Sequence, residues 1–318
     1  MSDRRTNSHP PETAEAGGEA TGRAASGAPA SGWAVADRFS WSEIYQRLLA
    51  SASEEVGSSR RELFFSGLTA GFAIVLTLIG HAVGVAHFPD NPFLSALLYP
   101  IGFIYIILGR YQLFTENTLP PVMLVLTRLG SVPLLLRVWT WVLFANVTGA
   151  ALGALILGHT SVLSPDAMQA GTTLATHGLE MAWWDVFFKA VFAGWLVAGV
   201  VWLGTAARDT VSRLLLVYLV FYVIAVAELF HVITAAAEVV FYLAAAPSDP
   251  GFGVLFSELW LPVLLGNTAG GVLVFTLVSY VQAPQKRFPQ LRELTTYEML
   301  FTYEGALSDV PHPVEPKE

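Results

Sequence analysis

Six long apolar segments constrain this 318-residue chain more than any other feature of its sequence. They cover residues 63–83, 94–126, 138–157, 186–206, 214–245 and 259–280. A helix of about 20 residues crosses a hydrocarbon layer of about 30 Å, so each segment is long enough to span a bilayer. Backbone N–H and C=O groups in that layer must pair within the protein, which favours helices. The sequence therefore predicts an all-α polytopic membrane protein with six transmembrane helices.

The composition agrees with this class and excludes others. Hydrophobic residues make up 54% of the chain and charged residues 13%, about half the charged share of an ordinary soluble domain. The net charge of −8 offers no basic stripe to a nucleic acid. The chain contains no cysteine, which excludes disulfides and thiolate metal sites. The sequence also has no metal-ligand spacing, nucleophile elbow or phosphate loop, so we predict neither an enzyme nor a cofactor or metal site.

The basic residues predict the topology. The loops on one side carry Arg60, Arg61, Arg128, Arg137, Arg208, Arg213, Lys286, Arg287 and Arg292. The alternate loops, residues 84–93, 158–185 and 246–258, contain no Lys or Arg. By the positive-inside rule, both termini are cytoplasmic in a multi-pass protein of the inner (cytoplasmic) membrane.

Four regions follow from these patterns. Residues 1–40 are rich in Ala, Gly, Ser, Pro and Glu and are predicted to form a disordered cytoplasmic tail. In residues 41–60, apolar side chains recur at helical spacing, which indicates an amphipathic helix. That helix can lie on the membrane surface, cap the cytoplasmic mouth of a pore, or pack against the bundle. Residues 61–282 are the predicted transmembrane transporter domain, and residues 283–318 are a cytoplasmic C-terminal tail.

The second apolar segment is interrupted. Arg110 and Glu116 lie at membrane depth, and Pro120-Pro121 follow. A charged side chain at that depth costs about 2.5 to 3.5 kcal/mol, and a proline removes a helix donor. Irregular backbone is tolerated there only where it lines a cavity or is buried in protein. Residues 113–117 are therefore the first candidate for a pore or substrate site, and a plain loop between two short helices is the alternative.

The two halves of the chain share an internal repeat. Phe64-Phe65, Ala70-Gly71, Trp139, Asn146 and Gly149 recur, at identical spacing within each span, as Phe187-Phe188, Ala193-Gly194, Trp260, Asn267 and Gly270, and residues 112–115 are placed opposite residues 228–231. Each half has three spans, an odd number, so the second half enters the membrane in the opposite orientation to the first. The sequence therefore predicts inverted repeats at about 61–158 and 184–282. Such repeats carry a transport site where two broken helices, here the second and the fifth, meet. Chance similarity between apolar segments is the alternative.

The second break contains His231. Imidazole is the side chain whose ordinary pKa, about 6.5, allows proton exchange near neutrality. Glu228 and Glu238 are close enough in the sequence to influence its charge. A packed histidine with satisfied hydrogen bonds is the alternative interpretation. The remaining histidines near the outer boundaries are interpreted as solvated loop residues: His81, His87, His159 and His177.

Three motifs resemble the signatures of the formate/nitrite transporter family. They are Leu113-Phe114-Thr115, His231, and residues 261–271, which read Leu-Pro-Val-Leu-Leu-Gly-Asn-Thr-Ala-Gly-Gly. The resemblance covers residues 61–281. It implies an aquaporin-like protomer in a homopentamer, with one pore per protomer that carries a small monovalent anion together with protons.

The resemblance also implies roles along the pathway. The predicted substrate pathway comprises Tyr99, Phe103, Leu113, Phe114, Thr115, Asn117, Ile224 and His231. In the family pattern the threonine and the histidine form a central pair, and the phenylalanine of Leu-Phe-Thr belongs to the cytoplasmic constriction. The outer constriction would be lined by Tyr99, Phe103 and Ile224.

The sequence departs from the family pattern around both breaks. Arg110-Tyr111-Gln112 replaces the usual small residues and acid, and Phe230 and Ala235 replace a glutamate and an asparagine beside the histidine. We therefore place the chain in a divergent branch. One hypothesis is that Arg110 and Glu116 form a buried pair that replaces the missing groups, with Glu228 acting near His231. A structural ion pair at the protomer interface is the alternative.

Three further groups complete the predicted site. The loops without Lys or Arg, with the adjoining ends of the spans, carry Asp90, Asp166, Glu180, Asp185, Asp249 and Glu258, whose charges repel anions. Lys189, near the outer end of the fourth span, is either the vestibule lysine that the family often carries or a membrane anchor. Asn146 and Asn267 are expected to form hydrogen bonds to the broken helices.

These observations predict a membrane channel or transporter for a small monovalent anion or its weak acid, of the formate/nitrite type. A bare anion crosses apolar constrictions only at a high desolvation cost. A proton from His231, or from water beside it, would let the solute cross as a neutral acid, and Thr115 can orient the imidazole or the anion. An aquaporin-like channel for small neutral solutes is the alternative. Such a channel would be expected to carry paired Asn-Pro-Ala motifs, but the only Asn-Pro in this chain, Asn91-Pro92, lies in an outer loop.

Overall fold

The computed structural model describes residues 39–245, 249–283, 293–303 and 305. The chain divides into two compact units, Met1–Glu43 and Ile44–Glu318, and the account below concerns the second. Nearly all of the predicted N-terminal tail, and most of the predicted C-terminal tail, lies outside the described residues. Every regular element found in the described residues is helical, which agrees with the predicted all-α class.

Among the described residues, four helices are long and apolar enough to cross a membrane. They are α2 (Arg60–His87), α6 (Val132–His159), α8 (Trp183–Ala206) and a continuous segment, Phe252–Gln282. That last segment consists of α11 (Phe252–Val254), η3 (Leu255–Trp260), α12 (Leu261–Ala269), η4 (Gly270–Leu277) and α13 (Val278–Gln282). These four helices match the first, third, fourth and sixth predicted spans, so the polytopic membrane class is confirmed.

The other two predicted spans are broken, as the sequence indicated. The first contains α3 (Pro92–Ser95), α4 (Ile101–Leu108), η1 (Glu116–Thr118) and α5 (Pro120–Leu126), and the second contains α9 (Thr210–Val226) and α10 (Val232–Ala245). Two residues after the end of α4 and of α9, Arg110 and Glu228 adopt φ angles of 57° and 53°. This left-handed backbone is rare for side chains with a Cβ, and it ends helical geometry at once.

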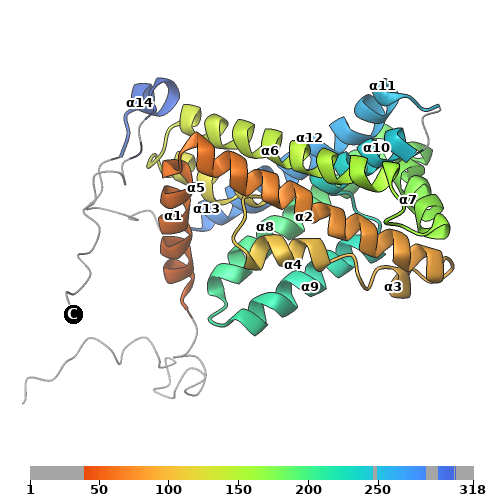
Figure 1. Ribbon diagram of the computed structural model, residues 1–318. Coiled ribbons are helices and arrows are strands. Elements are labelled where there is room, and N and C mark those ends of the chain that lie inside the picture. The colour runs from red at the N-terminus through yellow and green to blue at the C-terminus, as the bar shows by residue number, and fades with distance from the viewer. Residues whose placement is uncertain (1–38, 246–248, 284–292, 304, 306–318) are drawn as a thin grey trace, which may run out of the picture. The chain divides into compact units, whose positions relative to one another are not determined.

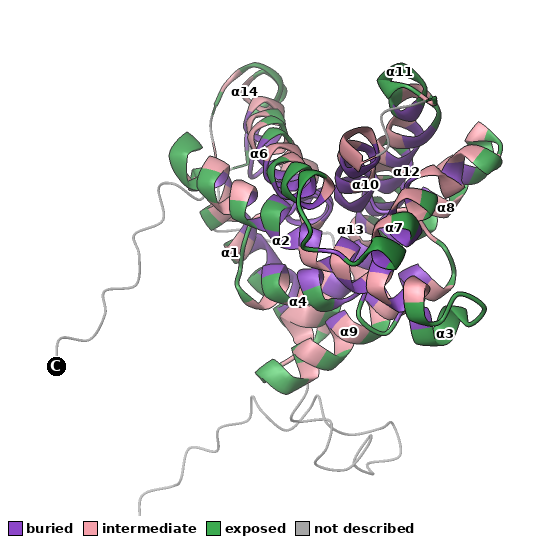
Figure 2. Cartoon of the chain, turned by 45° about the vertical axis from the view of Figure 1, so that its right-hand side comes forward, coloured by how far each residue is buried: buried purple, intermediate pink, exposed green. Residues whose placement is uncertain are grey.

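Glycines bring the helices together in two matching places. Helix α2 runs beside α6, where a Cβ on Gly71 would collide with the backbone carbonyl of Asn146 (Figure 1). Helix α8 packs against α12, where a Cβ on Gly194 would collide with the backbone carbonyl of Asn267. Buried residues lie on the faces that these helices turn toward one another (Figure 2). Backbones that approach this closely have no room for a larger side chain.

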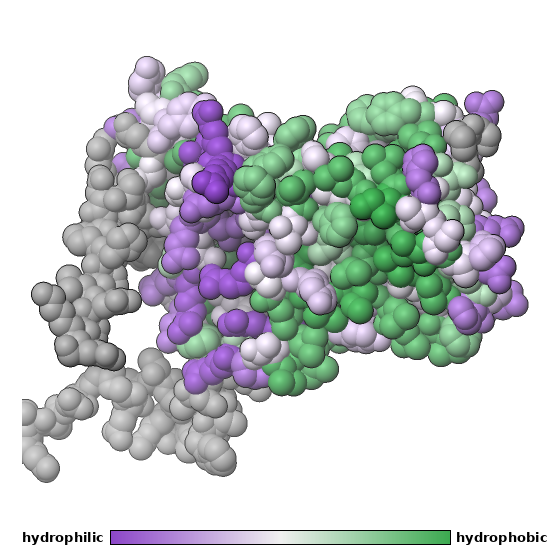
Figure 3. Space-filling model, viewed as in Figure 1, coloured by the Kyte–Doolittle hydropathy of each residue, from purple (hydrophilic) through white to green (hydrophobic). Residues whose placement is uncertain are grey.

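The surface is arranged as expected for a protein that sits in a bilayer. Apolar side chains cover the middle of the face shown in Figure 3, and polar side chains border it on both sides. Large aromatic side chains on the long helices remain more than half exposed, including Phe65, Phe144, Phe188 and Phe192. A contiguous apolar belt of this kind is suited to lipid or to a partner protomer rather than to water.

The amphipathic helix predicted in residues 41–60 is α1 (Trp41–Gly57). Its apolar face, which includes Leu48 and Leu49, is buried in the molecule, so this helix packs against the bundle. Arg137 on α6 donates a hydrogen bond to the carbonyl of Val56 at the end of α1. Three further elements complete the described chain: α7 (Pro165–His177), η2 (Gly178–Glu180) and α14 (Thr296–Phe301).

Candidate functional site

A buried threonine and histidine meet where the two broken segments approach each other. Thr115 Oγ1 lies 2.8 Å from His231 Nε2, and the two residues are 0% and 1% exposed. On the other side of the ring, Nδ1 lies 3.4 Å from the hydroxyl of Thr234. A neutral imidazole donates from one nitrogen and accepts at the other. A hydroxyl can serve either nitrogen, so this arrangement accommodates both tautomers of the ring.

Two cavities open on either side of this central pair. The outer cavity, named for the predicted outer loops that border it, has a volume of about 360 Å³ and is lined by residues that include His81, Tyr99, Glu228, His231, Thr234 and Glu238. The inner cavity has a volume of about 780 Å³ and is lined by residues that include Arg47, Glu55, Arg110, Glu116, Asn117 and Arg213. Among the described residues, the two linings have no member in common.

Aromatic rings fill the space beside the histidine. Phe103 and Phe221 are fully buried and stack with centroids 3.6 Å apart, and the edge-to-face contact of Phe103 with His231 has a centroid distance of 4.8 Å. Phe221 was not predicted, because it lies within an unbroken apolar run. Its position three residues before Ile224, on the same helical face, was the one available signal.

The other predicted pathway residues occupy different environments. Tyr99 lines the outer cavity, and Asn117 lines the inner cavity. Leu113, Phe114 and Ile224 are buried and line neither cavity. Phe114 packs against Trp139 with ring centroids 5.6 Å apart. Buried apolar side chains therefore separate the two water-accessible spaces in this conformation.

Asn146 holds the first break in place. Its Oδ1 accepts a hydrogen bond from the Phe114 amide, and its Nδ2 donates to the carbonyls of Gly67 and Gln112, all at 2.8 Å. Gly67 belongs to α2, so the asparagine ties irregular backbone to a long helix. The Phe114 amide and the Gln112 carbonyl lie in the break and lack a helical partner, which is costly in a membrane, and the amide side chain satisfies both.

Asn267 does the same at the second break. Its Oδ1 accepts from the Val232 amide, and its Nδ2 donates to the carbonyls of Ala190 and Phe230, again at 2.8 Å. Ala190 lies on α8, in the position that corresponds to Gly67 in the internal repeat. The two asparagines therefore make equivalent sets of bonds.

These bonds correct the register predicted between the breaks. Asn146 bonds the Gln112 carbonyl and Asn267 bonds the Phe230 carbonyl, so Gln112 is equivalent to Phe230. In the same register Arg110 is equivalent to Glu228, and both of these residues have left-handed backbone. The sequence comparison had placed Gln112 opposite Glu228 and was wrong by two residues. Short apolar motifs give little information on register, whereas the asparagine bonds depend on the actual backbone path.

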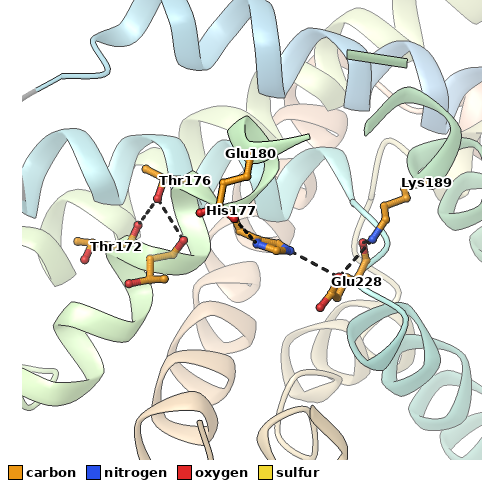
Figure 4. A network of polar contacts seen from close by, with 7 residues as sticks. Thr172, Thr176, His177, Glu180, Lys189 and Glu228 are labelled. Carbon is orange, nitrogen blue, oxygen red and sulfur yellow. Dashed lines mark hydrogen bonds and ion pairs between the residues drawn. The ribbon is translucent and has the colours of Figure 1, made fainter. Parts of the chain in front are cut away.

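Glu228 belongs to a polar network at the edge of the outer cavity (Figure 4). Its Oε2 lies 3.3 Å from Lys189 Nζ and 3.5 Å from His177 Nε2, and His177 Nδ1 lies 3.8 Å from Glu180 Oε2. Lys189 is thus held by a carboxylate. The interpretation of His177 as a solvated loop residue was wrong, because α7 carries it over the second break. His81 also lines the outer cavity, contrary to expectation.

The expected pairing of Arg110 with Glu116 is not found among the described residues. Both side chains line the inner cavity, but no ion pair within 4.0 Å joins them. The cavity, at about 780 Å³, has room for water between the two side chains. Glu55 of α1 lines the same cavity, and burial raises its pKa to about 7, against the opposing effects of Ser51 and Arg110.

Asn117 presents an unused acceptor at the inner cavity. Its Nδ2 donates to Gln112 Oε1 at 2.8 Å and to the Leu113 carbonyl at 3.0 Å. Its buried Oδ1 has no hydrogen-bond partner in the described chain. An unpaired buried acceptor is unfavourable unless water or a protonated solute reaches it. This amide is two residues from Thr115 and can receive such a donor.

The fold and the site together define a class of protein. Helices long enough to cross a membrane, two broken segments and a buried polar pair between two cavities describe a polytopic transporter or channel. The family model of the formate/nitrite transporters matches residues 42–281. The chain belongs to the formate/nitrite transporter family.

Individual relatives are distant. The chain is 27% identical over 244 residues to the inner membrane protein YfdC of Escherichia coli (strain K12), covering 75% of this chain and 77% of that protein. It is 20% identical to the formate channel BtFdhC of Bacillus thuringiensis, covering 79% and 97%. A solved FNT family ion channel superposes with a TM-score of 0.69 at 19% identity, covering 76% and 99%. A pentameric formate channel with formate bound has a TM-score of 0.62 at 20% identity, covering 70% and 96%.

Proposed function

We propose that this protein conducts a small monovalent anion, or the corresponding weak acid, across the inner membrane with proton assistance from His231. The observation that carries the proposal is the 2.8 Å contact between Thr115 Oγ1 and His231 Nε2, buried between two cavities. Formate is the first solute to test, because two relatives are described as formate channels. We also propose a homopentamer, because one of these is described as pentameric.

We propose six transmembrane helices arranged as two inverted three-helix repeats, with both termini cytoplasmic. The matching bonds of Asn146 and Asn267 support the repeat, as do the matching left-handed residues Arg110 and Glu228. The distribution of Lys and Arg among the loops supports the orientation. In such an arrangement the two broken helices meet near the middle of the bilayer.

The need for a proton follows from the apolar surroundings of the pair. A bare anion that passes the Phe103–Phe221 stack loses its hydration and gains no compensating charge. A weak acid carries no net charge and avoids most of that cost. His231 exchanges the proton, and the hydroxyls of Thr115 and Thr234 orient its ring in either tautomer.

Uptake into proteoliposomes tests this function. Labelled formate, labelled nitrite and glycerol are offered between pH 5 and pH 8 to the wild type, to His231→Ala and to His87→Ala, a control at an exposed histidine. We expect uptake of one anion to rise toward low pH in the wild type and in the control. We expect His231→Ala to lose that dependence.

A different pattern would contradict the proposal. If the wild type excludes both anions, and glycerol passes equally well in all three proteins, the protein is a channel for neutral solutes. The family membership would then describe the fold, and the residues around Arg110 would have altered the selectivity.

A further inference from the structure

Glu238 is a carboxylate in the outer cavity that the central pair does not use. It lies on α10, two turns beyond His231, and the residues that line the cavity from this segment are His231, Thr234, Ala235 and Glu238. Their spacing of three, four and seven residues places them on one helical face. One face of this segment therefore presents an imidazole, a hydroxyl and a carboxylate in succession from the central pair outward.

The hydroxyl between them contacts the central ring. Thr234 Oγ1 lies 3.4 Å from His231 Nδ1. Tyr99 lines the same cavity as Thr234 and Glu238, and its ring contacts His81 with centroids 5.3 Å apart. Polar side chains therefore accompany the carboxylate and the imidazole along the wall of this cavity.

The cavity wall favours cations and neutral solutes over anions. Its other titratable groups that face Glu238 from the packed elements are His81, Asp90, Tyr99, His177, Glu228 and His231, and no Lys or Arg from the described residues lines it. Lys189, a base on α8, is engaged by Glu228. An incoming anion thus meets carboxylates before it reaches the histidine, which calls for a proton donor within the cavity itself.

One polar atom of the outer cavity has no hydrogen-bond partner among the described residues. His81 lines the same cavity, and its buried Nδ1 makes no hydrogen bond within the described part of the chain. An unpaired buried nitrogen is unfavourable unless water or a solute fills the position. The outer cavity therefore contains both the side chain of Glu238 and an open hydrogen-bonding position.

We propose that Glu238 is a second proton-exchange site, which protonates the transported anion in the outer cavity before it reaches His231. This inference rests on the proposed function. The carboxyl group of Glu238 gives its proton to an oxygen of the anion, so the solute becomes a neutral acid and Glu238 becomes a carboxylate. Glu238 then recovers a proton from water in the cavity, which is continuous with the outer solution. In the opposite direction of transport, the same steps run in reverse.

The test is the initial rate of labelled formate uptake by full-length protein in proteoliposomes between pH 5 and pH 8. The variants are Glu238→Gln, which keeps the size of the side chain but cannot exchange a proton, and Glu258→Gln, a control at an exposed acid outside the cavity. We expect Glu238→Gln to reduce uptake about tenfold or more and to flatten its pH dependence, as loss of a positioned proton donor does. Glu258→Gln should match the wild type.

Each alternative outcome has a distinct meaning. If Glu238→Gln keeps the wild-type rate and pH profile while His231→Ala loses transport, this inference is overturned and the proposed function stands. If the wild type transports no anion, the proposed function fails, and the inference fails with it. If Glu238→Gln does not assemble, Glu238→His is tested instead. Imidazole and carboxyl differ in ordinary pKa by about 2, so the midpoint of the pH dependence of uptake should shift by about one pH unit or more. An unchanged midpoint overturns the inference.

Discussion

At the scale of single residues, His231 is a buried ring with a hydroxyl on each side of it. Thr115 is close at 2.8 Å and Thr234 more distant at 3.4 Å, so the hydrogen bond at Nε2 is the stronger of the two. Neither partner is charged, and each hydroxyl can donate or accept, so both tautomers of the neutral ring are accommodated. The stacked pair Phe103–Phe221 keeps bulk water from the ring on one side.

We predict that Thr115→Val slows formate uptake about tenfold or more, because it leaves a buried ring nitrogen unpaired at a cost of about 1 to 3 kcal/mol. Thr115→Ser keeps the hydroxyl and should retain most of the activity. Thr148→Val is the matched control, since Thr148 is bonded only to the carbonyl of its own helix. Initial rates at one pH compare the four proteins. A Thr115→Val rate equal to that of the wild type would contradict a positioning role for this hydroxyl.

At the scale of elements, each break depends on the long helices beside it. Asn146 and Asn267 supply three hydrogen bonds each, and these bonds require that α2 lies close to α6 and α8 close to α12. Glycine at Gly71 and Gly194 permits that approach. Helix packing and the geometry of the breaks are therefore coupled, and a change in one displaces the other.

Two substitutions on α8 test this coupling. Gly194→Ala should push α12 away, because its Cβ would collide with the Asn267 carbonyl, and we expect a lower yield of assembled protein and a lower Tm. Gly204→Ala should be tolerated, because nothing lies within 4 Å of a Cβ there. Size-exclusion yield and thermal unfolding in detergent measure both. Equal stability of the two variants would show that the close approach is not required.

A second prediction at this scale concerns the asparagines themselves. Replacing Asn146 or Asn267 by alanine removes three hydrogen bonds, each worth about 1 kcal/mol, and leaves backbone groups unpaired. We expect either variant to lower the yield of the oligomer and to leave the selectivity of the remaining protein unchanged. Normal assembly with altered selectivity would instead place these amides on the substrate pathway.

At the scale of the whole molecule, the two cavities differ in character. Carboxylates and histidines line the outer one, whereas arginines and glutamates from several elements line the larger inner one. Helix α1 contributes Glu55 to the inner cavity, so part of its wall is formed by a segment outside the membrane spans. Any change in the position of α1 therefore alters that cavity.

The raised pKa of Glu55 predicts how pH affects this contact. Burial raises the pKa from 4.5 to about 7, so the docked helix binds the proton more tightly than the released one. Docking is strongest below about pH 4.5 and weakens as the pH rises through about 7. The chain has no cysteine, so a spin label attached through Glu54→Cys can report α1 mobility. We expect more mobile label at pH 8 than at pH 5.5, and no such difference when Glu55→Gln is added. If label mobility still depends on pH after Glu55→Gln, a group other than Glu55 causes that dependence.

The sequence by itself determined the four long apolar helices and the two breaks. Each of these depends on local properties: the length of an apolar run, a proline pair, and a charge at membrane depth. The resemblance to the formate/nitrite transporter family, carried by Leu113-Phe114-Thr115 and His231, pointed to the central pair. The sequence also predicted the hydrogen bonds of Asn146 and Asn267 to the broken helices, because a polar residue that recurs in an apolar span needs a backbone partner each time.

Only the tertiary structure decided the register of the breaks, the Phe103–Phe221 stack and the network of Lys189, His177 and Glu228. It also separated Arg110 from Glu116, because the left-handed backbone at Arg110 redirects the chain after α4 and a large cavity can solvate both charges. These features join residues far apart in the sequence or depend on a single backbone angle. Residue type and spacing do not specify such contacts, since they arise from how the helices pack.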